Sequence, residues 1–229
     1  MKINFGRKEE EFLISSLPYS LYPMQTSLSS LTQEIRTDYD IDLAPIIPDY
    51  IAKDLEKYNI ELSIAKPHAF ITYDEEKGIF RYNLVEPPLD LNVFQIYLAL
   101  ISETERNLLS NANYMELGKI LDDLSKKKSN LNVFQGKTGN MRQLSTPFKV
   151  ALYYVLRNMF GYNIITPLLL DTKIEDISVS GINLPIYVYH REFEYTPTNI
   201  VFTKNTNIFG INIDGEELLD ELVLRFISL

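Results

Sequence analysis

The sequence contains no cysteine, which excludes disulfide bridges and thiolate metal sites. It has only two histidines, His68 and His190, and neither stands at a spacing typical of zinc ligands. We therefore expect no metal site. Basic residues are also scarce: 22 lysines and arginines against 31 aspartates and glutamates give a net charge of −9. This charge argues against a nucleic-acid partner and against attraction to anionic lipid.

Long apolar runs are missing as well. The most apolar stretch, residues 89–101, is too short and too polar to span a bilayer. The N-terminal residues lack the apolar core and small-residue cleavage site of a signal peptide. The hydrophobic fraction of 45% over 229 residues is that of an ordinary globular protein with a buried core. We therefore expect a cytoplasmic chain.

A phosphate-binding loop is also missing, although FQGKTGN, residues 134–140, resembles the end of one. Such a loop needs Gly-x-x-x-x-Gly-Lys-[Ser/Thr] between a buried strand and the N-terminus of a helix. The position five before Gly136 is Leu131, which cannot take the tight turn that glycine permits. The flanking segments are too polar for a buried strand and a closing helix. We interpret residues 129–144 as a linker and expect Lys137 to hold no nucleotide.

The patterns that are present predict a mixed fold. Prolines interrupt residues 1–58, so we expect an irregular arm that ends in a short helix over 48–59. A hairpin follows, with strands over 68–74 and 79–85, because polar and apolar residues alternate in the second strand. Further helices are predicted over 91–109, from Asn113 to about 128, over 147–160 and after Asp214. Short strands are predicted over 175–181, 185–191 and 198–203.

Two helix starts have specific signals. Asn113 and Glu116 match the N-cap and N3 positions of a capping box, and Thr146 precedes Pro147 at a first helical position. The last helix is still apolar at Leu229, which indicates a longer protein. Together these features predict an α/β (α+β) fold. After the arm at 1–58, a first subdomain with the hairpin and helices would span 59–162. A small α/β subdomain with a short sheet would span 163–229.

Two polar pairs adjoin strands of that short sheet: Glu175 with Asp176, and His190 with Arg191. One interpretation is an ordinary strand edge and turn. The other is an interface at which Arg191 meets an anion on another domain or subunit, because its planar guanidinium suits phosphate. The residues alone leave both interpretations open.

The segment TPLLLDTKIEDISVSGINLPIYVYHREFEYTPTNIVF, residues 166–202, resembles the archaeal branch of the type II/type IV secretion ATPases. These are motors for pili, protein secretion and the archaellum. The matching elements are Pro-Leu-Leu-x-Asp at 167–171, Ile-Glu-Asp-Ile-Ser at 174–178, Pro-Ile-Tyr-Val-Tyr-His-Arg at 185–191, and 198–200. YNLVEPP at 82–88 is similar too, so the resemblance covers about residues 65–229.

The resemblance implies the N-terminal region of a hexameric motor, ahead of a RecA-like domain that binds ATP and Mg. The chain has no Walker motifs, so we expect no cofactor and no hydrolysis in these residues. The implied partners are the RecA-like domain of the same protein, neighbouring subunits and an integral membrane platform protein. Arg191 is the implied contact to nucleotide or a neighbouring subunit, with His190, Glu175 and Asp176 beside it. The alternatives are a freestanding adaptor for a separate motor and, less favoured, a small-molecule sensor.

Overall fold

The computed structural model describes residues 35–109, 115–209 and 211–227. Contacts divide the chain into two compact units, each made of separated stretches of sequence. The sheet unit comprises the described parts of residues 1–42, 67–86 and 161–229, and the helical unit comprises residues 43–66 and 87–160. The fold is α+β, as the sequence predicts.

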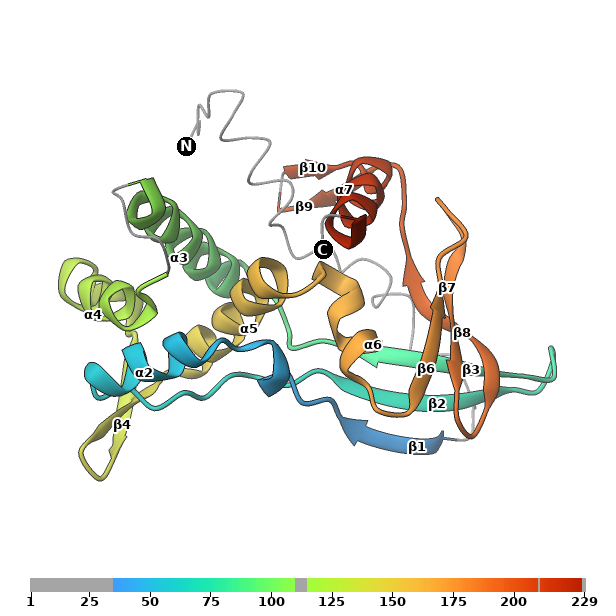
Figure 1. Ribbon diagram of the computed structural model, residues 1–229, viewed down its shortest axis with the longest axis horizontal. Helices are drawn as coiled ribbons and strands as arrows, with labels where there is room; N and C mark the ends of the chain where they lie inside the picture. The colour runs from blue at the N-terminus through green and yellow to red at the C-terminus, as the bar shows by residue number, and fades with distance from the viewer. Residues whose placement is uncertain (1–34, 110–114, 210, 228–229) are drawn as a thin grey trace. The chain divides into compact units, whose positions relative to one another are not determined.

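A curled mixed sheet forms the centre of the sheet unit (Figure 1). Its strands are β1 (Ile35–Asp40), β2 (His68–Asp74), β3 (Ile79–Val85), β6 (Ile174–Ser178), β7 (Pro185–His190) and β8 (Glu194–Val201). They lie in the order β1-β2-β3-β8-β7-β6, and every neighbouring pair is antiparallel except β3 and β8. The predicted hairpin is confirmed. The sequence placed it in a different subdomain from the last three strands, whereas the structure joins them in one sheet.

One side chain completes the parallel contact between β3 and β8, which has a single register match at Tyr82 and Thr198. The side-chain carbonyl of Asn199 accepts the Leu84 N–H at 2.9 Å, and its amide group donates to the Leu84 carbonyl, also at 2.9 Å. Asn199 thereby replaces the two backbone bonds that a continuing ladder would supply.

The sheet unit also contains η6 (Asn163–Ile165), α6 (Thr166–Leu170), β9 (Thr206–Ile208), β10 (Ile211–Ile213) and α7 (Gly215–Ile227). The side chain of Asp214 accepts the Glu216 N–H at 2.8 Å and so caps α7, the helix that the sequence predicts after Asp214. The other end of α7 packs on the start of this stretch. The ring of Phe226 stacks on Tyr162 at 4.3 Å, and Arg225 donates to the Gly161 carbonyl at 3.2 Å.

The helical unit contains η4 (Ala44–Ile46), α2 (Asp49–Lys57), α3 (Leu91–Leu109), α4 (Leu117–Lys127), η5 (Ser129–Leu131), β4 (Phe134–Thr138), β5 (Met141–Leu144) and α5 (Thr146–Phe160). Its core is built around α5, whose residues 150–158 are buried on every side. The guanidinium of Arg157 is fully buried there. Its Nε donates to Asn158 at 2.8 Å and it lies over the ring of Tyr154, and both contacts offset the cost of burying the charge. In the described part of the chain, no helix is long and apolar enough to cross a membrane.

Four local predictions need correction. The helix expected from Asn113 begins at Leu117, so Glu116 is its N-cap rather than N3; Asn113 itself lies outside the described residues. The expected linker 129–144 contains the hairpin β4–β5, whose turn uses Gly139 at a positive φ of 61°. Residues 195–197, left between the predicted strands 185–191 and 198–203 as a turn, belong to β8, and the chain turns at 191–193 instead. The part of the expected arm that the structure describes contains β1 and η4, and residues 1–34 lie outside it.

Candidate functional site

The candidate site lies where β6 and β7 begin to separate at one end of the sheet. Arg191 directly follows β7, and its backbone N–H donates to the Lys173 carbonyl at 2.9 Å. Its side-chain Nε lies 3.3 Å from Oε1 of Glu175, and the two side chains are 61% and 52% exposed. The structure therefore brings two of the predicted site residues together as an ion pair on the surface.

A β-bulge positions Glu175 for this contact. In the register of β6 and β7, Ile174 pairs with His190 and Asp176 pairs with Tyr189, which leaves Glu175 as the extra residue. A bulge of this kind bends a strand locally and re-aims a side chain. Asp176 follows the bulge and is also exposed. Three of the four predicted residues are thus exposed, and two of them, Arg191 and Glu175, are in contact.

His190, the fourth predicted residue, does not reach this surface. Its side chain is fully buried, and its Nδ1 accepts the Glu192 N–H at 3.1 Å while its ring packs against Phe193. Burial lowers the pKa of His190. His190, expected beside Arg191 as a candidate contact, is therefore turned into the sheet unit, away from the surface that carries Arg191. The alternation of β7 explains this orientation, because Ile186, Val188 and His190 all point to the buried face.

A buried polar network joins the two edges of the curled sheet, and sequence reasoning missed it. One carboxylate oxygen of Asp171 accepts the hydroxyl groups of both Tyr39 and Tyr82 at 2.7 Å. The other oxygen accepts the Lys173 N–H at 2.9 Å. The ammonium of Lys173 donates to Thr37 at 3.2 Å and lies 4.1 Å from the centre of the Tyr39 ring. Thr37 and Tyr39 belong to β1, so this cluster ties β1 to the segment that enters β6.

The environment of this network keeps both tyrosines protonated. Burial, followed by the hydrogen bond to Asp171 and its charge, raises the pKa of Tyr39. Burial and the charge of Asp171 raise the pKa of Tyr82 well above its ordinary value. The network has a structural role, since Tyr82 and Asp171 are nearly inaccessible to solvent. Asp171 stands in the matching Pro-Leu-Leu-x-Asp element, but nothing local in the sequence indicated its two partners.

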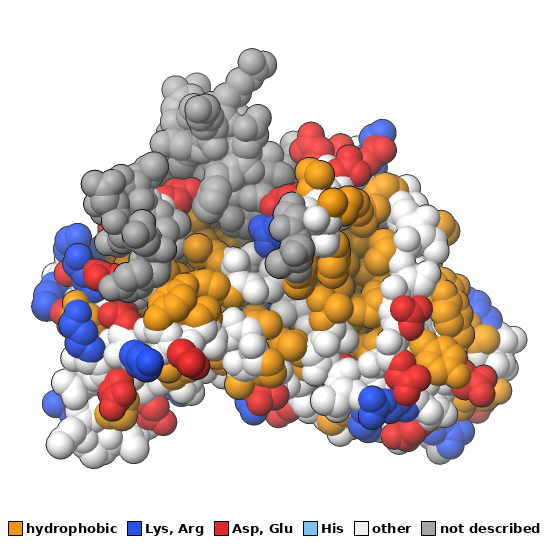
Figure 2. Space-filling model, viewed as in Figure 1, with side chains coloured by type: hydrophobic (Ala, Val, Ile, Leu, Met, Phe, Trp, Pro, Cys, Tyr) orange, Lys and Arg blue, Asp and Glu red, His pale blue; other side chains and the backbone are white. Residues whose placement is uncertain are grey.

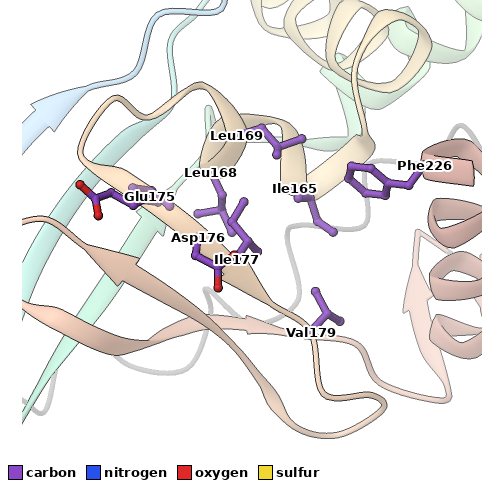
Figure 3. A pocket seen from close by; sticks show the side chains of 9 residues that line it. Ile165, Leu168, Leu169, Glu175, Asp176, Ile177, Val179 and Phe226 are labelled. Atoms are coloured by element: carbon purple, nitrogen blue, oxygen red, sulfur yellow. The ribbon is translucent and has the colours of Figure 1, made fainter. Parts of the chain in front are cut away.

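An apolar groove of about 300 Å³ lies beside β6 (Figure 3). Figure 2 shows hydrophobic side chains gathered on the surface formed by the elements around it. Its lining comes from η6, α6, β6 and the end of α7, together with Val179: Ile165, Leu168, Leu169, Ile174, Glu175, Asp176, Ile177, Val179 and Phe226. The predicted polar residues Glu175 and Asp176 therefore border an apolar depression.

Other candidate chemistry finds no support in the geometry. Lys137 lies in β4, paired with Arg142 of β5, so the FQGKTGN stretch is a hairpin rather than a strand–loop–helix cradle. His68 begins β2, and its ring nitrogens contact the carboxylates of Asp38 and Asp40 of β1. Among the residues that the structure describes, no three histidine, aspartate or glutamate side chains are grouped so that they could hold a metal ion.

Comparison with known proteins gives a distant relative. No family model matches the chain. An uncharacterized protein of Methanocaldococcus jannaschii is similar to it, with 29% identity over 150 residues. The matched part is 66% of this chain, and the chain spans about 58% of the length of that relative.

Proposed function

We propose that this chain is the N-terminal coupling region of a hexameric secretion or type IV pilus assembly ATPase. In this role it transmits nucleotide-driven motion from the RecA-like domain and neighbouring subunits to an integral membrane platform protein, at the inner face of the cell membrane. ATP and Mg are bound by the parent protein. The support from sequence is the resemblance of residues 166–202. The structural observation that carries the proposal is the exposed ion pair of Arg191 and Glu175.

The exposure of this pair is what suits it to coupling. An ion pair open to solvent contributes only about 0–1 kcal/mol, so Arg191 can leave Glu175 at little cost. A charge-assisted contact from a guanidinium to a phosphate or a buried carboxylate is worth about 1.5–3 kcal/mol. Arg191 is therefore held near its working position by a weak local partner. It can exchange that partner for a stronger one when another domain closes on it.

The test is nucleotide hydrolysis by the intact gene product. Arg191→Ala is expected to lower the rate roughly tenfold to a hundredfold, since it removes about 1.5–3 kcal/mol from the closed state. Arg191→Lys keeps the charge but loses the planar fork, so we expect a partial rescue. Melting temperatures of all variants should stay within a few degrees of the wild type.

Lys204→Ala is the matched control, because Lys204 forms a similarly exposed ion pair with Glu216 in the same unit, 3.6 Å apart. Its activity should remain at the wild-type level. If Arg191→Ala melts early, the arginine is structural. If neither activity nor melting changes, Arg191 has no part in coupling.

The alternative is a freestanding adaptor that binds a separate motor. The observation that favours it is the apolar surface at the end of α7, where Leu224 and Ile227 are 63% and 74% exposed. Such a surface would serve a partner supplied as a different chain equally well. Light scattering of this chain mixed with a purified motor ATPase distinguishes the two: a stoichiometric complex supports the adaptor.

A further inference from the structure

The outer edge of β6 runs along the apolar groove. Within the described residues, β6 pairs with β7 on one side and with no strand on the other. Side chains alternate between the faces of a strand, so a groove on one face would meet every second residue. Asp176 and Ile177 are consecutive, both follow the bulge, and both line this groove. The groove therefore follows the edge of the strand rather than one of its faces.

The opposite wall of the groove is apolar. It consists of Ile165, Leu168 and Leu169 from η6 and α6, with Phe226 from α7 (Figure 3). An open strand edge offers backbone N–H and C=O groups to another chain. In recognition by strand addition, the backbone bonds hold an extended peptide while pockets take alternate side chains. Both requirements meet in this groove.

We propose that β6 and the groove accept an extended segment of a partner protein as an added strand. The segment carries apolar residues at alternate positions, directed at the wall formed by α6 and Phe226, and a lysine or arginine beside Asp176. The proposal rests on the proposed function for the existence of a partner, and it adds how that partner is held.

Charge selects this occupant over a second copy of the chain. Asp176 is exposed and forms no ion pair with another residue in the described ranges, whereas Glu175 beside it already faces Arg191. Pairing two β6 edges about Asp176 would place its carboxylate against its own copy, and like charges on adjacent strands destabilise a sheet. A basic segment meets opposite charge at the same position. The chain as a whole carries a net charge of −9, which also favours a basic partner.

The test uses the whole chain and a short capped peptide in which valine and lysine alternate. We expect the peptide to bind in calorimetry and to shift the amide signals of residues 174–179 in NMR spectra, with slower hydrogen exchange at the edge of β6. A peptide of the same sequence with alternate backbone nitrogens methylated keeps the side chains but loses donors. It should bind at least about tenfold more weakly.

Two leucines provide a matched pair of variants. Leu169 lines the groove and is 44% exposed, whereas Leu184 is 49% exposed and lies outside it in the same unit. Leu169→Asp should reduce peptide affinity at least about tenfold by placing a charge in the apolar wall. Leu184→Asp should leave the affinity unchanged, and both variants should fold because both side chains already face solvent.

Three results would overturn the proposal. Equal binding of the methylated peptide means that no backbone ladder forms. Tighter binding of a helix-stabilised peptide of the same composition means that the groove takes a helix. Equal binding of a valine–glutamate peptide removes the charge argument. None of these outcomes involves nucleotide, so a failure of the peptide proposal does not change the result of the hydrolysis test of Arg191. Conversely, a failure of the hydrolysis test does not change the result of the peptide-binding experiments.

Discussion

At the carboxylate of Asp171, one oxygen accepts two tyrosine hydroxyl groups, and this arrangement has a consequence at alkaline pH. The pKa values of Tyr39 and Tyr82 are both raised in the folded chain, whereas an unfolded tyrosine titrates near pH 10. A group whose pKa is raised on folding contributes stability that is fully present below the unfolded value and is lost as pH rises above it. The network should therefore weaken above about pH 10.

Tyr82→Phe tests this dependence. Each tyrosine that ionises only on unfolding should lower the free energy of unfolding by about 1.4 kcal/mol per pH unit above pH 10. Removing the Tyr82 hydroxyl should reduce that slope by the contribution of one tyrosine, about 1.4 kcal/mol per pH unit. At neutral pH it should lower the free energy of unfolding by about 1 kcal/mol, because a hydrogen bond is lost. Urea unfolding between about pH 9 and pH 11 measures both quantities. An unchanged slope in Tyr82→Phe would show that Tyr82 is not protected from ionisation.

The burial of His190 could have been predicted from the sequence. Its burial follows from the alternation of Ile186, Val188 and His190 along β7, so that signal was present before the structure. The pKa of His190 is lowered, so its neutral form contributes stability that is present above about pH 6.5 and declines as pH falls below it. The groups that face it include Asp171 and Glu192, which favour the charged form, and Lys173, which opposes it. The family resemblance placed this histidine beside Arg191, and the alternation of β7 turns its side chain to the opposite, buried face.

At the scale of elements, the sheet depends on a contact that no local pattern predicts. Helices α3 and α5 and the hairpin β2–β3 follow from periodicity and prolines, and their bounds match the expectations closely. The parallel contact of β3 with β8 joins residues more than a hundred positions apart in the chain. Its specificity lies in the amide of Asn199, and an isolated asparagine in a sequence carries no such signal. The same reason explains why the partners of Asp171 were missed.

Asn199→Asp tests this joint between elements. A carboxylate can still accept the Leu84 N–H, but it cannot donate to the Leu84 carbonyl and would repel it. We expect a loss of about 1–3 kcal/mol in the free energy of unfolding, measured by urea denaturation. Asn212→Asp is a suitable comparison, because Asn212 is an exposed asparagine of β10 in the same unit and should cost less than about 0.5 kcal/mol. Equal effects at both positions would contradict a special role for Asn199.

At the scale of the whole molecule, the sequence predicts two consecutive subdomains, one with the hairpin and helices over 59–162 and a small α/β one over 163–229, whereas the units of the structure alternate along the chain. Both units are discontinuous in sequence, since residues 67–86 join the sheet and residues 43–66 join the helices. Single boundaries along the chain at 58 and 162 cannot describe two units that are each made of separated stretches of sequence. The ion pair of Arg191 and Glu175 required both the bulge in β6 and the turn after β7, of which the sequence indicated neither.

We propose that nucleotide state reaches the surface formed by β6 and the turn after β7. Hydrogen–deuterium exchange tests it most directly, on the intact protein or on its complex with a separate motor. The comparison is between the nucleotide-free state and a bound non-hydrolysable ATP analogue. Exchange in residues 174–191 should slow when the analogue binds, while exchange in the buried helix α5 should stay the same. Unchanged exchange across residues 174–191, with the motor shown to be saturated by the analogue, would contradict the claim.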